Sequence, residues 1–172
     1  MSTSVHVRHE RPGDEEAIAR VHERAFGQLT ESRIVAAVRQ AGRAVISLVA
    51  VDASGIVGHI LFTALAVDSP GPPISALALG PMAVLPEVQR RGVGSRLVAA
   101  GLETCALTGC QAVAVIGHPS YYPRFGFRPG ASYGLRSEFA VPDDVFMIAE
   151  LTADALTGRA GIVRYTREFR MD

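Results

Sequence analysis

The chain has 172 residues, of which 48% are hydrophobic and 20% are charged. This composition is typical of a globular protein with a real core, so we expect residues 1–172 to form a single domain. Lysine plus arginine equals aspartate plus glutamate at 17 each, so no global charge favours nucleic acid or anionic lipid as a partner. Any anion site must therefore be local.

Targeting, membrane and metal signals are not found in the sequence. The opening stretch MSTSVHVRHERPGDEE contains no apolar signal-peptide region, and no run approaches the ~18 apolar residues of a membrane helix. Cys105 and Cys110 are too few for a disulfide framework and lack metal-site partners, so we expect small, buried or half-buried thiols and no metal. We therefore expect a reduced, soluble, cytoplasmic protein.

Hydrophobic periodicity divides the first half of the chain into strands and helices. Strands are expected where apolar and polar residues alternate, or where apolar residues run together between turn signals. Helices are expected where apolar residues keep helical spacing, with Asp14 and Thr30 as caps and Gly42 just past the end of the second helix. The expected elements are a strand at 5–8, helices at 11–26 and 30–42, and strands at 44–52, 56–67 and 74–84.

The second half predicts a strand–helix–strand crossover and then shorter pieces. A helix from about Gly92 to Leu107 joins strand 74–84 to a short buried strand at 111–116, so these two strands are expected to pair in parallel. Gly80-Pro81 interrupts the earlier strand, and because proline cannot donate to a ladder, we expect a bulge or a divergence there. The remaining pieces are a loop with room for one helical turn at 118–130, a late strand at 144–151 and an extended end at 156–169.

A glycine-rich turn, EVQRRGVGSRLVAA, follows the strand that ends near Val84. The first N–H groups of the next helix have no intrahelical partner and lie at the positive end of its dipole, which suits a phosphate. Gly92 and Gly94 remove the Cβ atoms that would block a close approach. The dinucleotide pattern fails because Leu97 occupies the third glycine's place, and the ATP-loop pattern fails because no Gly-Lys-Ser/Thr follows. The residues alone leave two readings, a phosphate site or a helix start that needs small residues for packing.

A second motif lies downstream, in YYPRFGF, where an aromatic residue, Tyr122, stands four places before the pair Gly126-Phe127. Together with MAVLPEVQRRGVGSRLV, it resembles the signature of the GNAT superfamily of acyl-coenzyme-A-dependent N-acetyltransferases. The resemblance covers residues 5–130 in element order. It implies a mixed α/β fold, with a central, mostly antiparallel sheet that contains a splayed parallel strand pair and is flanked by helices.

The resemblance also implies acetyl-coenzyme A as cosubstrate, bound mainly by backbone groups. The strand before the turn would pair with the pantetheine arm, and the turn with the first helical turn would hold the pyrophosphate, assisted by arginines. The residues that match these family positions are Met82, Ala83 and Val84 for the arm, and Arg90, Arg91, Gly92, Val93, Gly94 and Ser95 for the pyrophosphate.

The reaction that the resemblance implies is direct attack of a neutral amine on the thioester, with Tyr122 as proton donor to the leaving sulfur. A phenol with a pKa of ~10 is chemically reasonable in this role, although Tyr122 could instead be a packing aromatic. Strand 74–84 carries no carboxylate to serve as base, and Glu87 lies toward the pyrophosphate. His118 is the first candidate base and His59 the second, with a water chain as an equal alternative.

The acceptor is not specified by the sequence. We favour a small-molecule amine over a protein amine, and we leave open a homodimer and an acyl group longer than acetyl. The alternative function is a non-catalytic acyl-coenzyme-A binding or sensing module, and the third is a structural partner with a fortuitous glycine turn. Charged residues that could contact an acceptor are Arg24, Glu31, Arg128, Arg136, Glu138, Asp143 and Asp144.

Overall fold

The computed structural model describes residues 4–170. The chain folds into two compact units, of which unit 1 comprises residues 4–62, 81–101 and 167–170, and unit 2 comprises residues 63–80 and 102–166. The prediction of a single domain is not tested by this division and stays a prediction. Within the described residues, no helix is both long enough and apolar enough to span a bilayer.

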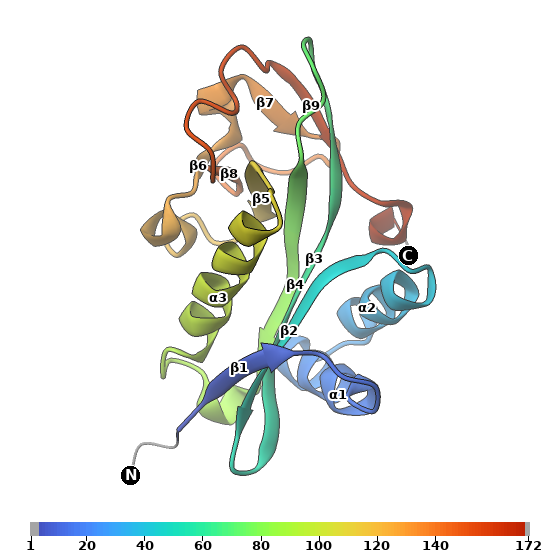
Figure 1. The fold of residues 1–172 in the computed structure, drawn as a ribbon. Helices are drawn as coiled ribbons and strands as arrows, with labels where there is room; N and C mark the ends of the chain where they lie inside the picture. The colour runs from blue at the N-terminus through green and yellow to red at the C-terminus, as the bar shows by residue number, and fades with distance from the viewer. Residues whose placement is uncertain (1–3, 171–172) are drawn as a thin grey trace. The chain divides into compact units, whose positions relative to one another are not determined.

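Unit 1 is a sheet with helices packed on it (Figure 1). Its strand order runs from β1 through β2 to the first part of β3 and the last part of β4, with β1 and β2 antiparallel. Its elements are β1 (His6–His9), α1 (Glu15–Phe26), α2 (Thr30–Gln40), β2 (Ala44–Asp52), β3 (Gly55–Asp68), β4 (Ala76–Val84), η1 (Pro86–Val88), α3 (Val93–Leu107) and η4 (Arg167–Arg170), of which β3, β4 and α3 continue into unit 2.

Helices α1 and α2 bury one apolar stripe each against the strands. Ile18 of α1 and Val35 and Val38 of α2 pack with Val49 of β2 and Leu61 of β3 in one core cluster. The predicted helices and strands of this region are present, with ends that differ by a few residues. Burial of the apolar stripe, rather than helix propensity alone, holds such short helices in place.

Asp14 holds the predicted N-cap position of α1 without a side-chain cap bond, and the predicted cap Thr30 is wrong. Asp14 precedes α1, but its carboxylate accepts from Nη1 of Arg8 at 2.8 Å and from the N–H of Arg11 at 2.7 Å, and it makes no cap bond. Thr30 is the first residue of α2, and the cap position belongs to Leu29, which has no polar side chain. Gly42 lies just past the end of α2, with a φ of 70°.

Two glycines allow α3 to pack directly on β3 in unit 1. A Cβ atom on Gly58 would lie 3.0 Å from Cδ1 of Leu97 and 3.3 Å from Cγ1 of Val93. A Cβ atom on Gly101 would lie 2.5 Å from ring carbons of Phe62, which is fully buried. The first turns of α3 therefore sit on the strand backbone itself.

Unit 2 is built around a parallel strand pair. Ala76–Leu79 of β4 pair in parallel with Ala112–Val115 of β5, as predicted. Around this pair, β8 lies antiparallel beside β5 and β6, while β9 is antiparallel to β3 and parallel to β7. The further elements of the unit are β5 (Ala112–Ile116), η2 (Tyr122–Phe125), β6 (Arg128–Pro129), η3 (Gly130–Tyr133), β7 (Leu135–Ser137), β8 (Phe146–Glu150) and β9 (Gly161–Arg164).

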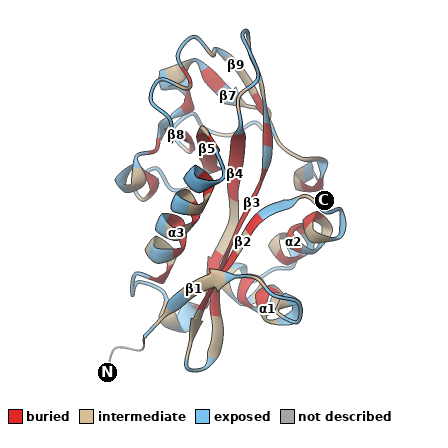
Figure 2. Ribbon diagram, viewed as in Figure 1, coloured by how far each residue is buried: buried red, intermediate tan, exposed pale blue. Residues whose placement is uncertain are grey.

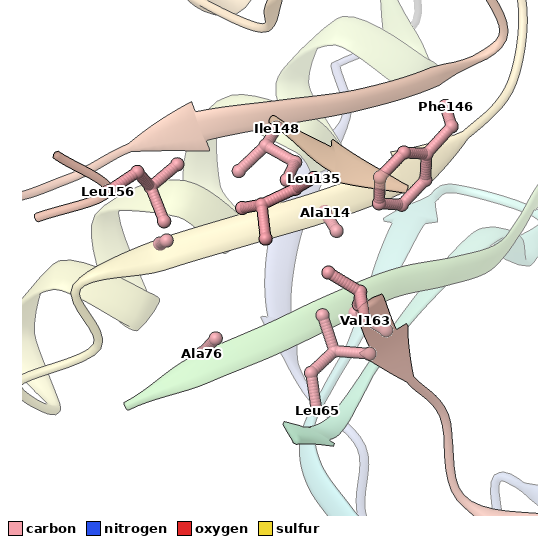
Figure 3. Packing of buried hydrophobic residues seen from close by; sticks show 10 residues of the cluster. Leu65, Ala76, Ala114, Leu135, Phe146, Ile148, Leu156 and Val163 are labelled. Atoms are coloured by element: carbon pink, nitrogen blue, oxygen red, sulfur yellow. The ribbon is translucent and has the colours of Figure 1, made fainter. Parts of the chain in front are cut away.

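An apolar cluster fills one face of the unit 2 strands (Figure 3). Ala76 and Ala114 of the parallel pair are small, and larger side chains such as Leu135, Ile148 and Phe146 pack over them. In each unit, buried positions are concentrated on the strands (Figure 2). The sheet is mixed and mostly antiparallel, as expected, and η2 is the predicted helical turn.

The close approach of Gly101 to Phe62 predicts that alanine at this helix glycine destabilises the protein, which is the opposite of the usual effect. Replacing a mid-helix glycine with alanine normally stabilises a protein by up to about 1 kcal/mol. We expect Gly101→Ala to lower the free energy of unfolding by about 1–3 kcal/mol instead, because the fully buried ring of Phe62 would have to shift. Urea unfolding measures this, with Glu103→Ala on the exposed face of α3 as the control. A stabilised Gly101→Ala variant would contradict the packing.

Candidate functional site

The turn between β4 and α3 contains a run of backbone amides without hydrogen-bond partners among residues 4–170, which we call open amides. Arg90 and Gly92 have φ values of 64° and 82°, and the N–H of Arg96 donates to the carbonyl of Gly92 at 3.0 Å. Across the described part of the chain, no hydrogen bond occupies the N–H groups of residues 90–94. Left-handed residues at a helix start direct neighbouring amides to one side, which forms an anion-binding concavity.

Two side-chain contacts hold this turn in unit 1. Nε2 of Gln89 donates to the carbonyl of Val84 at 2.9 Å and so closes the loop on the strand that it leaves. Glu87 forms a two-point ion pair with Arg24 of α1, at 2.7 and 3.0 Å, which lowers the pKa of the Glu87 carboxyl. Because Glu87 and Arg24 are paired with each other, Glu87 is not available as a catalytic base, and Arg24 is not available to bind an acceptor.

The residues of the turn fit a phosphate. Besides the open amides, the guanidinium groups of Arg90, Arg91 and Arg96 are exposed and form no ion pair with any of residues 4–170. Just upstream, Ala83 and Val84 are buried at the end of β4 and Met82 is half-buried. A phosphate placed here would meet N–H donors, the helix dipole and mobile positive charge together.

The parallel ladder stops where the sequence predicts an irregularity. The last pair between β4 and β5 is Leu79 with Val115. Gly80 follows with a φ of 132°, a conformation that side chains other than glycine rarely adopt, and Pro81 has no N–H to give to a ladder. An unpaired strand end of this kind can hydrogen-bond an extended ligand through its backbone.

Tyr122 is held in unit 2 by a glycine and by aromatic rings. A Cβ atom on Gly117 would lie 2.5 Å from Cε2 of Tyr122, and the rings of Tyr121 and Phe127 stand 5.0 and 5.6 Å away, centroid to centroid. Its hydroxyl has no hydrogen-bond partner among the described residues. Burial, with the neighbouring Tyr121, raises the pKa of Tyr122 to about 12, so the phenol keeps its proton at neutral pH. Gly117 was not predicted as a site residue; its place directly after β5 was the available signal.

His118 begins the turn that carries Tyr122. Its carbonyl accepts from the N–H of Tyr121 at 3.1 Å and of Tyr122 at 3.4 Å, and the residue is exposed. The backbone of His118 therefore stabilises the turn that leads into η2. Its role as the base stays a prediction.

His59 belongs to a buried hydrogen-bond chain in unit 1. Nδ1 of His59 lies 2.8 Å from Nε2 of His22, and its Nε2 lies 2.8 Å from the hydroxyl of Ser47. That hydroxyl donates to Glu10 at 2.8 Å, and Glu10 is bound at two points by Arg39, at 2.9 and 3.0 Å. This series of hydrogen bonds connects α1, α2, β2 and β3 with the segment that follows β1.

The direction of this chain follows from the donors available. Because the single hydroxyl proton of Ser47 goes to Glu10, Ser47 must accept from Nε2–H of His59. Nδ1 of His59 then accepts from Nε2–H of His22, so the ring of His59 is neutral, and the buried Nδ1 of His22 has no partner within residues 4–170. Burial and then the charge of Arg39 lower the pKa of His22 to about 4, so this ring is neutral near pH 7. Burial, then His22 and Arg39, also lower the pKa of His59 well below its ordinary value. Both nitrogens of His59 are engaged, which argues against His59 as a base.

Several charged residues considered for acceptor binding have partners inside the fold. Besides Arg24, Glu31 accepts from Nε2 of Gln28 at 2.6 Å, and Glu138 accepts from the N–H of Tyr165 at 2.9 Å. Both predicted free thiols, Cys105 and Cys110, are buried. Within residues 4–170, no three acidic, histidine or cysteine side chains gather as metal ligands would.

Comparison with known proteins identifies the family. Residues 6–130 match the acetyltransferase (GNAT) domain family. The chain is 40% identical to the uncharacterized N-acetyltransferase YjhQ of Escherichia coli K12 over 84% of this chain and 83% of that protein. It superposes on the crystal structure of E. coli YhbS in complex with CoA with a TM-score of 0.93 and 30% identity, covering 99% of this chain and 94% of that one. A Brucella melitensis GNAT acetyltransferase in complex with acetyl-CoA gives a TM-score of 0.79 and 30% identity over 96% and 98%.

The neutral histidine pair makes stability depend on pH. Unfolded histidine titrates near ~6.5, whereas His22 in the fold takes up a proton only at a pKa of about 4. Between these values the unfolded chain binds more protons, so the free energy of unfolding falls as the pH drops from 6.5 to 4. His22 alone contributes on the order of 3 kcal/mol to this fall.

Urea unfolding at pH 7 and at pH 4.5 measures the effect. We expect His22→Gln to be less stable than wild type at pH 7 and to lose less stability on acidification. His6→Gln, at an exposed histidine, is the control and keeps the wild-type slope. Equal slopes in wild type and His22→Gln would show that the pair is not neutral in the fold.

Proposed function

Because the chain belongs to the GNAT acetyltransferase family, we propose that it transfers an acetyl group from acetyl-coenzyme A to a small primary amine by direct attack. The observation that carries the proposal is the run of open amides at residues 90–94 beside three exposed arginines. The two solved relatives that contain CoA or acetyl-CoA support the choice of cosubstrate.

We assign the pyrophosphate to the turn and the first turn of α3. The amides of Arg90, Arg91, Gly92, Val93 and Gly94 would donate to it, with Ser95 at the same helix start, and the arginine side chains would add longer-range attraction. The pantetheine arm is assigned to the backbone of Met82, Ala83 and Val84, which follows the break in the ladder at Gly80-Pro81. The thioester that these groups hold supplies the acetyl group.

We assign the leaving sulfur to the hydroxyl of Tyr122. This hydroxyl has no partner within the described chain, and it stays protonated well above neutral pH, so it is a hydrogen-bond donor ready for developing negative charge. His118 or a water chain would remove the proton that an ammonium ion must lose before attack. Because Glu87 is paired with Arg24 and both ring nitrogens of His59 are hydrogen-bonded, His118 or water remains for this step.

The alternative is a non-catalytic acyl-coenzyme-A binding module, which would keep the open amides and need no donor. The buried setting that Gly117 provides for Tyr122 favours the enzyme, because a packing aromatic would not need an unbonded hydroxyl. A cytoplasmic location and a homodimer stay predictions.

The amide assignment predicts that backbone conformation matters more than any one arginine. Gly92→Ala places a Cβ at a φ of 82°, which costs about 1–2 kcal/mol and distorts the turn, so we expect about tenfold weaker binding of coenzyme A. Arg91→Gln is expected to weaken binding only about threefold, because an exposed charge is screened. Isothermal titration of the purified protein with coenzyme A gives both values.

Gly109→Ala is the matched control for that titration. Gly109 has a φ of 86° at the other end of α3 and no atom within 4 Å of its added Cβ, so the strain is similar but distant from the turn. We expect it to bind coenzyme A as wild type does. Wild-type affinity in Gly92→Ala would contradict the amide assignment, and no measurable binding by wild type would refute the proposed function.

The donor assignment predicts a loss of kcat in two variants. Tyr122→Phe is expected to lower kcat about 10²-fold or more at an almost unchanged KM for acetyl-coenzyme A. Gly117→Ala would displace the Tyr122 ring and produce a smaller loss, and adding it to Tyr122→Phe would cost little more. Thiol release with an amine panel measures these rates, with Tyr121→Phe as the control. An unchanged rate in Tyr122→Phe would remove Tyr122 from the mechanism.

A further inference from the structure

Unit 2 contains a pocket of about 670 Å³ beside β7. This volume is typical of sites for small molecules, which range over roughly 300–1,000 Å³. Its walls combine an apolar side with charged groups. The lining includes Leu135, Phe139, Val141 and Phe146 on the apolar side, and Arg136, Glu138 and Asp143 among the charged residues.

The three charged groups of the lining are not equally available. Glu138 is largely buried, and its carboxylate accepts from the N–H of Tyr165 at 2.9 Å and lies 3.9 Å from Nη1 of Arg164. Arg136 and Asp143 are exposed, and neither side chain has a hydrogen bond or ion pair with any other described residue. The pocket therefore offers a ligand one open positive charge and one open negative charge.

The pocket adjoins the backbone that positions Tyr122. The N–H of Gly117 donates to the carbonyl of Val145 at 3.0 Å, and the next residue, Phe146, pairs with Ile116 and forms part of the pocket wall. Gly117 is also the residue against which the ring of Tyr122 packs. One wall of the pocket and the glycine that supports Tyr122 are thus joined by backbone pairing between β5 and β8 and by the hydrogen bond that extends it.

We propose that this pocket receives the acceptor, and that the acceptor is a small primary amine that also carries an acidic group. The proposal rests on the acetyl transfer proposed above. Arg136 binds the acidic group, because its planar guanidinium matches a carboxylate or a phosphate at two points. Asp143 attracts the amine, which reaches the protein as an ammonium ion. The apolar wall covers the carbon chain between them.

The same charges select against other amines. An alkylamine of equal length leaves Arg136 without a partner, so it gains less from the pocket. A diamine brings a second positive charge toward Arg136, which repels it. The expected order of preference is the acidic amine first, the alkylamine second and the diamine last.

The test compares four probes with acetyl-coenzyme A at saturation: 4-aminobutanoate, 3-aminopropyl phosphate, butylamine and 1,4-diaminobutane. Thiol release gives kcat/KM for each, and titration of the coenzyme-A-saturated protein with each probe gives its affinity even where turnover is slow. We expect at least one acidic probe to exceed butylamine by ~10-fold or more. The carboxylate and phosphate probes together show which acidic group is preferred.

Arg136→Gln supplies the decisive comparison. It is expected to remove the ~10-fold advantage of the acidic probes while changing the values for butylamine by less than about twofold. Arg20→Gln, at an exposed residue of α1 outside the pocket, is the matched control and keeps the wild-type preference. Circular dichroism and the melting temperature confirm that both variants fold.

Two outcomes overturn the proposal while leaving the proposed function intact. One is that wild type binds and acetylates butylamine or the diamine as well as the acidic probes. The other is that Arg136→Gln lowers the values for all four probes equally, or for none. Failure of the proposed function is distinct, because it appears in the separate titration as an absence of coenzyme A binding.

Discussion

The end of the parallel ladder between β4 and β5 is the constraint on which the rest of the structure depends. Pairing stops after Leu79 and Val115, because Gly80 turns the backbone to a φ of 132° and Pro81 lacks a donor. From this point β4 runs on to Val84 and then into the glycine turn, while β5 ends at Ile116 and leads to Gly117. One interruption therefore precedes both segments to which the proposed site residues belong. It also leaves backbone groups of a parallel pair unpaired, which a compact fold tolerates only where something else can bind them.

Charge in this protein is informative because much of it is neutralised locally. The net charge is zero, and Glu87 with Arg24, and Glu10 with Arg39, already form two-point ion pairs. Among residues 4–170, the charged side chains without partners include the three arginines beside the turn, Arg90, Arg91 and Arg96, and two side chains of the pocket in unit 2, Arg136 and Asp143. A charged residue in a loop says little by itself, since most are solvated or paired. A charged side chain without a partner, beside other groups that can bind a ligand, says more, and the proposed phosphate site and the proposed acceptor site both rest on this combination.

The sequence was most informative where a feature is local. The helix and strand order, the break at Gly80-Pro81 and the glycine turn all follow from neighbouring residues, so periodicity and turn chemistry predict them. Strands β6 and β7 were not predicted, because two or three residues are too few to show the alternation of apolar and polar side chains. Asp14 stands at the N-cap of α1 but makes no cap bond, because its carboxylate pairs with Arg8, a contact that helix statistics do not contain. The contact of His22 with His59 joins residues 37 positions apart, and the support of Tyr122 by Gly117 depends on how a loop folds back. Such contacts require the fold.

The high pKa of Tyr122 is compatible with its proposed role once protons are counted. A phenol with a pKa of about 12 does not give its proton freely to a thiolate whose own pKa is ~8.5. The attacking amine, however, loses one proton for each sulfur that gains one. Tyr122 can accept that proton as it donates its own, so it passes a proton without ever becoming a phenolate. A side chain that resists ionisation suits this role better than an acidic one, because it keeps its proton between turnovers. On this account a base is needed only to convert the ammonium ion to the amine, so the missing carboxylate on β4 is no obstacle to the reaction.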